Sequence, residues 1–187
     1  MLPIGEAFPS VLDAAQSGAA WALERLYRAV GPAVAGYLRV QGSREAEDLT
    51  SEVLYRALTG VGSFSGDEAR FRSWVLTIAH HALVDERRRL ARRPRSATER
   101  PEDVGATTPA GDVEEEALQR LGTERVLRMC ADLPVDQRDV LLLRMAAGMS
   151  LEETATAVGK SVGAVKALQR RALAALRRNF SREGVSQ

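Results

Sequence analysis

A segment rich in proline and glycine near the middle of the chain limits what the sequence can fold into. Residues 93–111 contain three prolines and two glycines but almost no large apolar residue. A helix does not continue through such a stretch, which is typical of a linker. The sequence on either side is long enough for a small domain of its own. We therefore expect two domains, residues 1–93 and 118–187, joined by a linker over residues 94–117.

Apolar residues recur every three or four positions on both sides of this linker, which is the spacing of buried helical faces. One helix is expected around residues 23–38, with a kink or a break at Gly31–Pro32. A second is expected from Ser43, as its cap, to about Leu58, and a third over residues 68–92. No stretch alternates with a period of two for long enough to form a strand. The sequence therefore predicts an all-α fold.

The C-terminal part of the sequence carries the caps of successive helices. One helix opens at Pro134, a residue favoured in the first helical turn. Ser150 and Glu153 have the spacing of a capping box, in which each side chain bonds the backbone amide of the other residue. Gly159 suits the positive φ of a helix end, and Ser161 is placed to cap the next helix.

The spacing of these helices is that of a helix-turn-helix. Counting from Leu151, Ala155 is the fifth residue, Gly159 the ninth and Val165 the fifteenth. These places need a small residue at the helix crossing, a tolerance of positive φ, and an apolar anchor. The second helix of such a unit lies in the DNA major groove, where arginine and glutamine can pair with base edges. The residues that we predict to bind DNA here are Ser161, Lys166, Gln169, Arg170, Arg171 and Arg177.

The net charge of +1 conceals three charged segments. Residues 87–100 carry seven arginines against one acid, residues 101–117 six acids and no base, and residues 160–182 seven bases and no acid. Such a distribution favours a partner that is locally anionic, and nucleic acid is the leading candidate. A set of solvated helix faces is the alternative explanation for the same charges.

Several other classes of protein find no support in the residues. No apolar run approaches the ~20 residues that cross a bilayer, and no signal-peptide pattern is visible, so we expect a cytoplasmic protein without membrane insertion. Cys130 is the single cysteine and leaves a cysteine zinc site three ligands short. His81 and Asp85, four residues apart, could begin a metal site, but no third ligand stands at a useful spacing. We expect no catalytic residue, metal, cofactor or small-molecule substrate.

Motifs in both halves resemble those of a known family, and they follow one another along the chain in the same order as in that family. Residues 48–53, 71–79 and 85–88 resemble the second domain of bacterial sigma factors. Residues 133–144 and the helix-turn-helix resemble their fourth domain. With only these two domains, the chain is similar to the extracytoplasmic-function (ECF) group. The resemblance implies an alternative sigma factor that binds core RNA polymerase and promoter DNA, has no enzymatic activity, and is held inactive by an anti-sigma factor.

The resemblance also implies roles for individual residues. The helix-turn-helix would bind the −35 duplex, and the acidic linker would run toward the polymerase cleft. The residues that match the polymerase-docking segment are Asp48, Leu49, Glu52 and Val53. The residues that match the segments binding the melted −10 strand are Phe64, Ser65, Gly66, Asp67, His80, His81 and Arg88. In the third helix His80, His81 and Arg88 are expected to point away from the apolar stripe, whereas Trp74 is interpreted as a core residue.

Some positions depart from the family pattern. Ser51 stands where glutamine is usual in the docking segment, and His81 where asparagine is usual. In the second helix of the helix-turn-helix, Ala164 and Leu168 replace a common threonine and arginine. The promoter sequence therefore does not follow from the resemblance. An alternative function is a stand-alone helix-turn-helix regulator with a ligand-sensing N-terminal domain, which would bind duplex DNA without polymerase.

Overall fold

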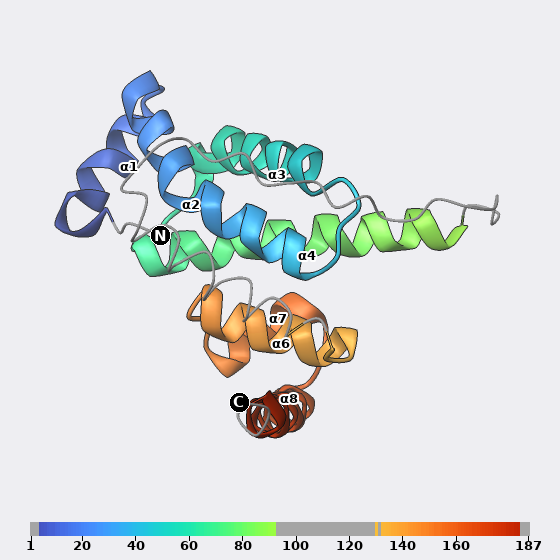
Figure 1. The fold of residues 1–187 in the computed structure, drawn as a ribbon. Coiled ribbons are helices and arrows are strands. Elements are labelled where there is room, and N and C mark those ends of the chain that lie inside the picture. Colours follow the sequence, from blue (N-terminus) through green and yellow to red (C-terminus); the bar gives the residue numbers. More distant parts are fainter. Residues whose placement is uncertain (1–3, 93–129, 131, 184–187) are drawn as a thin grey trace.

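The computed structural model describes residues 4–92, 130 and 132–183, and every regular element in those ranges is helical (Figure 1). The all-α prediction is confirmed. The linker predicted at residues 94–117 lies outside the described residues, and the domain boundaries stay a prediction. The elements are η1 (Gly5–Ala7), α1 (Phe8–Gln16), α2 (Ala20–Val40), α3 (Ala46–Gly60), η2 (Val61–Ser63), α4 (Glu68–Arg92), α6 (Val135–Ala146), α7 (Leu151–Val158) and α8 (Val162–Glu183).

Helices α2, α3 and α4 lie side by side and share one core, with α1 packed at one end (Figure 1). Its largest fully buried side chains include Leu26, Leu54 and Phe71, one from each of the three helices. Helix α2 continues unbroken through Pro32, so a break there is wrong. Gly31 is buried against α3, where a β-carbon would lie 3.6 Å from Leu54 Cδ1. The packing of apolar residues on both sides of Pro32 holds the helix together despite the lost hydrogen bond.

The start of α3 differs from the prediction that Ser43 caps it. The helix begins at Ala46, and the Ser43 hydroxyl donates instead to Glu86 Oε1 of α4, at 3.0 Å. The same carboxylate oxygen accepts hydrogen bonds from the backbone N–H groups of Arg44 and Glu45, at 3.2 and 3.4 Å. A buried side chain from a neighbouring helix therefore satisfies the amides before α3, which a local sequence pattern does not reveal.

The C-terminal half has the predicted helix-turn-helix. Ser150 and Glu153 form both bonds of the capping box, at 3.0 and 2.7 Å, and Gly159 has φ +64°. Ser161 Oγ accepts from the Ala164 amide at 3.2 Å, so it caps α8 as expected. Ala155 and Val165 are buried at the crossing of α7 with α8. The caps, the turn and the anchor predicted from the spacing are all confirmed.

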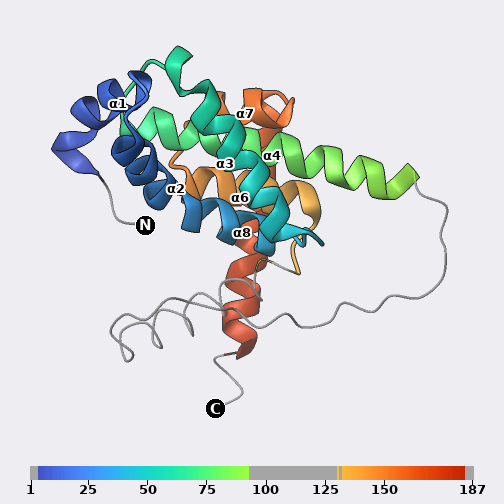
Figure 2. The ribbon, with the colours of Figure 1, turned by 90° about the horizontal axis from the view of Figure 1, so that it is seen from above.

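Helix α8 extends away from the other helices over much of its length (Figure 2). Helices α6 and α7 lie between α8 and the N-terminal half (Figure 1). This placement leaves one long side of α8 open to solvent. Within the ranges described, none of the helices is long and apolar enough to span a bilayer.

Candidate functional site

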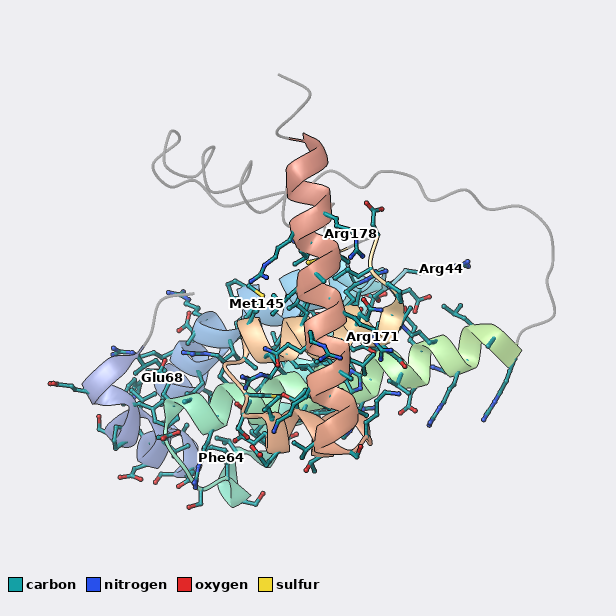
Figure 3. All side chains as sticks on the ribbon, turned by 90° about the horizontal axis from the view of Figure 1, so that it is seen from below. Arg44, Phe64, Glu68, Met145, Arg171 and Arg178 are labelled. Carbon is teal, nitrogen blue, oxygen red and sulfur yellow. The ribbon has the colours of Figure 1, made fainter. Side chains whose placement is uncertain are left out.

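The outer side of α8 carries the predicted duplex-binding residues. Lys166, Arg170, Arg171 and Arg177 are exposed, Gln169 is half-buried, and the cap Ser161 stands exposed at the start of the helix. A shallow groove runs along this side between Lys166 and Arg177 and includes Leu173. Figure 3 shows Arg171 and Arg178 at different heights along the helix. A basic helix side of this length can contact base edges near its start and phosphates further along.

The loop between η2 and α4 holds four of the residues predicted to bind the melted −10 strand, Phe64, Ser65, Gly66 and Asp67. Phe64 is half-buried, with its ring centroid 5.3 Å from that of Phe71 and 5.2 Å from that of Trp74. Gly66 has φ +152°, and a β-carbon there would lie 3.0 Å from Arg70 Cδ and 3.2 Å from Phe64 Cζ. Only glycine fits this turn without displacing its neighbours.

The ends of this loop are also fixed. Asp67 Oδ1 accepts from the Arg70 amide at 2.8 Å and so caps α4, while Ser65 is exposed. A hollow of about 640 Å³ lies between the loop and α1, lined by Phe64, Gly66 and Asp67 on one side and by Leu12 and Gln16 on the other. The structure therefore places the four predicted loop residues together beside a cavity.

The predicted −10 residues of α4 do not share one environment. His81 is exposed and Arg88 is exposed beside Asp85, at 3.7 Å. His80 is only 4% exposed and forms a hydrogen bond with the Tyr37 hydroxyl, at 3.0 Å. The expectation that His80 points away from the core is therefore wrong, because the helical rotation that exposes His81 turns its neighbour inward. Trp74 is half-buried in the aromatic cluster, consistent with its interpretation as core.

The environment of His80 keeps its imidazole neutral. Burial lowers the pKa of His80 from 6.5 to about 4, and the nearby His81 and Arg87 add to this effect. Burial likewise raises the pKa of Tyr37, so its phenol stays protonated and can remain in the hydrogen bond with His80. A neutral buried histidine of this kind connects α2 to α4 and is not available to bind a phosphate.

Two exposed carboxylates of helix α3 stand one turn apart on the same face. Asp48 and Glu52 are exposed, and Glu52 is paired with Arg56. Leu49 and Val53, also predicted to bind polymerase, are 4% and 0% exposed. The prediction of direct contact is wrong for these two residues, because they point into the core shared with α2 and α4 and position the helix instead.

Models of two protein families match the chain. The first, Sigma-70 region 2, matches residues 26–93, and the second, Sigma-70 region 4, matches residues 123–176. The chain is 33% identical over 180 residues to the ECF RNA polymerase sigma factor SigD of Mycobacterium tuberculosis, covering 92% of this chain and 84% of that protein. The chain belongs to the ECF sigma factors.

Further relatives agree with this assignment, and a solved structure has the same fold. The sequence is 34% identical over 175 residues to the M. tuberculosis ECF sigma factor SigC, covering 91% of this chain and 90% of that one. It is 35% identical over 170 residues to the Streptomyces coelicolor ECF sigma factor BldN, covering 90% of this chain but 64% of the longer BldN. The fold is similar to that of CnrH in complex with the cytosolic domain of CnrY, with a TM-score of 0.61, 24% identity, and coverage of 94% and 98% of the two chains.

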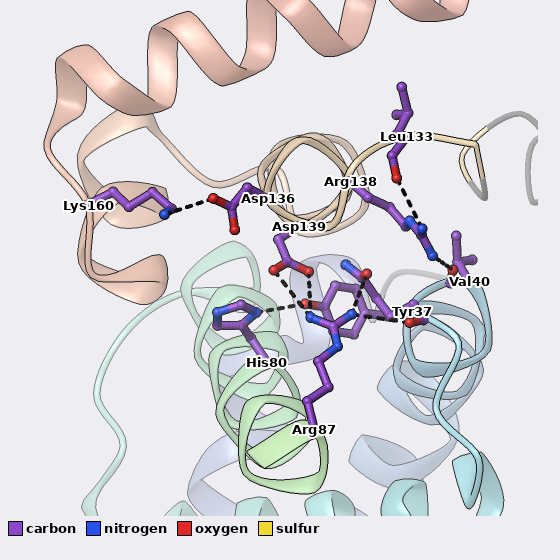
Figure 4. A network of polar contacts seen from close by, with 10 residues as sticks. Tyr37, Val40, His80, Arg87, Leu133, Asp136, Arg138, Asp139 and Lys160 are labelled. Carbon is purple, nitrogen blue, oxygen red and sulfur yellow. Dashed lines mark hydrogen bonds and ion pairs between the residues drawn. The ribbon is translucent and has the colours of Figure 1, made fainter. Parts of the chain in front are cut away.

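The two halves of this ECF sigma factor meet through a polar network (Figure 4). Arg87 of α4 donates to both carboxylate oxygens of Asp139 of α6, each at 3.4 Å, and to the backbone and side-chain oxygens of Gln41, at 3.1 and 3.0 Å. Arg138 of α6 donates to the Val40 carbonyl at 3.0 Å. Burial raises the pKa of Asp139, and Arg87 opposes that shift. Together these contacts join α6 to the ends of α2 and α4.

A further contact joins the helix-turn-helix to α4. His81 Nε2 lies 3.2 Å from the Ala157 carbonyl of α7, so this nitrogen donates in that contact. The predicted −10 residue His81 and the basic residue Arg87 are therefore both engaged by the C-terminal half.

Sequence patterns did not single out every residue at these surfaces. Tyr55 lies seven residues after Asp48 on the outer side of α3 and is 71% exposed. A large exposed aromatic beside two carboxylates is typical of a protein contact surface. The helical period from Asp48 through Glu52 could have indicated Tyr55. The Arg87–Asp139 pair carries no such signal, because it joins residues 52 positions apart.

Proposed function

We propose that this ECF sigma factor directs core RNA polymerase to promoters by contacting two promoter elements and the polymerase through separate parts of its fold. The exposed side of α8 binds the −35 duplex, the Phe64–Asp67 loop and α4 bind the melted −10 strand, and the outer face of α3 docks on polymerase. The observation that carries the proposal is the capped helix-turn-helix, whose second helix exposes Lys166, Arg170, Arg171 and Arg177 to solvent. The protein has no catalytic chemistry in this scheme and acts in the cytoplasm beside polymerase.

The proposed docking face consists of Asp48, Glu52 and Tyr55. The two carboxylates are one helical turn apart and exposed, which suits a partner surface that is basic. Leu49 and Val53 fix the rotation of α3 from the buried side.

The −10 contacts of the proposal centre on the loop. A base that leaves the stack needs an apolar surface and polar groups around it, and the hollow beside Phe64 offers both. Arg88, exposed on α4, is suited to the phosphates on either side of that base.

Promoter binding in this scheme requires the two halves to separate. His81 and Arg87 are engaged by α7 and α6, so they become available to DNA only when these contacts are broken. We propose that binding to core polymerase drives the separation. We also propose an anti-sigma factor as a partner of the free protein. A structural neighbour, the sigma factor RpoE of Bartonella quintana, is described in complex with the anti-sigma factor NepR. The similarity to RpoE has a TM-score of 0.59 and 22% identity, and it covers 84% of this chain and 96% of RpoE.

The stand-alone regulator is not favoured, because models of sigma-factor regions match both halves of the chain. Run-off transcription with purified core polymerase on fragmented genomic DNA tests the proposal and also returns the promoter. We expect defined transcripts with the protein and core together, and none from core alone. Identical transcripts with and without the protein would refute the proposed function.

A further inference from the structure

The N-terminal helix α1 contacts the Phe64–Asp67 loop, which is proposed to bind the −10 strand. Helix α1 lies outside the region that the Sigma-70 region 2 model matches, because that region begins at residue 26. Gln16, the last residue of α1, is central to this contact. Its side-chain nitrogen donates to the Val61 carbonyl at 3.1 Å and to the Phe64 carbonyl at 2.7 Å. These bonds join residues 45 and 48 positions apart, so they connect α1 with both η2 and the loop that follows it.

The far end of the loop is bound to the same N-terminal segment. Glu68, the first residue of α4, accepts from the backbone amides of Ile4 and Gly5, at 3.0 and 2.8 Å. The ring centroid of Phe8 lies 5.8 Å from that of Phe71. Phe8 thereby packs the N-terminal segment against the cluster of Phe64, Phe71 and Trp74. Residues 4–16 therefore hold the loop at both ends. Figure 3 shows Phe64 and Glu68 on the same side of the molecule as this segment.

The chemistry of this contact requires a glutamine-like amide. Both acceptors are carbonyl oxygens, and one NH₂ group supplies two hydrogens, so Gln16 can satisfy both. A glutamate of the same shape has no hydrogen to donate when ionised and would place a carboxylate oxygen against two carbonyl oxygens. Gln16 can therefore be tested by an isosteric substitution that removes only the donors.

We propose that Gln16 is a positioning residue for −10 recognition: its amide fixes the Val61 and Phe64 carbonyls and thereby sets the loop geometry that selects the unstacked base. The inference rests on the proposed base-capture function of the loop. The proposed role of Gln16 runs through the loop: both of its amide hydrogens are committed to the two carbonyls, so they cannot donate to a base. The apolar residues of α1, including Val11 and Ala15, keep the helix in place independently of Gln16.

The test uses the full chain with core polymerase on the promoter found by run-off transcription. Three further promoters carry the other three bases, one in each, at the −10 position whose base is proposed to leave the stack. The variants are Gln16→Glu and Gln16→Ala. Ser17→Ala is the matched control, because Ser17 follows the last residue of α1 and its hydroxyl donates back to the Asp13 carbonyl at 2.9 Å, away from the loop. Permanganate reactivity of −10 thymines measures opening, and the ratio of opening on the best base to opening on the others measures discrimination.

We expect both Gln16 variants to lose discrimination by about thirtyfold, the size expected when two hydrogen bonds of ordinary net strength are lost. Protection of the −35 region should stay unchanged, and Ser17→Ala should match the wild type. Equal loss of opening on every promoter with an unchanged ratio would show a merely structural role and overturn the inference. Wild-type discrimination in both variants would also overturn it. If the wild-type protein itself opens no promoter, the proposed function fails first and the inference fails with it.

Discussion

Reversing the charges of Asp48 and Glu52 on α3 should weaken polymerase docking while leaving the stability of the fold nearly unchanged. In the variant with Asp48→Lys and Glu52→Lys, the exposed face changes from acidic to basic while the buried residues of the helix stay in place. Asp48 stands in the first turn of α3, where an acidic side chain contributes about 0.3–1 kcal/mol. The exposed pair of Glu52 with Arg56 contributes about 0.3–0.5 kcal/mol. The cost in folding free energy is therefore about 1 kcal/mol.

That cost corresponds to a decrease in melting temperature of roughly 2–4 °C for a chain of this size. Association with core polymerase should fall far more, because two attractive contacts each become repulsive. Co-purification with core and thermal melting of the same preparation measure the two effects. A double variant of equal charge change, Glu24→Lys with Glu47→Lys, is the control, since both residues are exposed and lie off the proposed face.

Two results would exclude α3 as the docking helix or show that its carboxylates are structural. Co-purification of the Asp48 and Glu52 variant with core at the wild-type yield would remove α3 from the docking surface. A melting temperature lowered as strongly as by truncation of buried Leu49, for which about 2–5 kcal/mol is expected, would show that the carboxylates are structural.

Four further predictions concern DNA binding and the junction of the two halves. If Arg171 pairs with a guanine, Arg171→Ala should weaken −35 binding by about 1–3 kcal/mol at one base pair. Competition among DNA duplexes that differ at single bases measures this loss, and equal weakening on every duplex would show that Arg171 contacts a phosphate instead. Phe64→Ala should leave −35 footprints intact and reduce permanganate reactivity at −10, and normal opening would reject base capture. The free energy of unfolding should fall as the pH drops from 6.5 to about 4, by up to about 3 kcal/mol, since the unfolded chain protonates His80 before the folded one does. Denaturant titrations of His80→Gln should lack this part of the pH dependence, and an unaltered profile would contradict the burial argument. Asp139→Asn removes the ion pair between the halves and should increase the radius of gyration of the free protein in small-angle scattering, whereas an unchanged radius would mean that the pair does not hold them together.

The helix-turn-helix could be predicted almost completely from the sequence because its determinants are local. The capping box, the glycine at positive φ and the cap of α8 involve residues three or four positions apart, and each is satisfied within its own segment. The bounds expected for α4, residues 68–92, also agree with the structure, since a charged first turn and a long apolar stripe mark that helix clearly.

The less local features were not predictable in the same way. His80 is buried and His81 is exposed, although both are histidines, because the rotation of α4 against α2 decides which faces Tyr37. Leu49 and Val53 belong to a motif associated with docking, yet their apolar side chains gain more free energy from burial in the core than from exposure. Gln16 had no pattern to mark it, since its acceptors are backbone carbonyls more than 40 residues away.

Footprinting with and without core polymerase tests the central proposal most directly, because only a sigma factor needs polymerase to contact both promoter elements. The wild-type protein, core polymerase and their complex would each be bound to the promoter from the run-off experiment and probed with DNase and permanganate. We expect −35 protection and reactive −10 thymines with the complex and neither with the protein or core alone. Strong protection of paired half-sites by the protein alone, unchanged when core is added, would contradict it and support a stand-alone regulator.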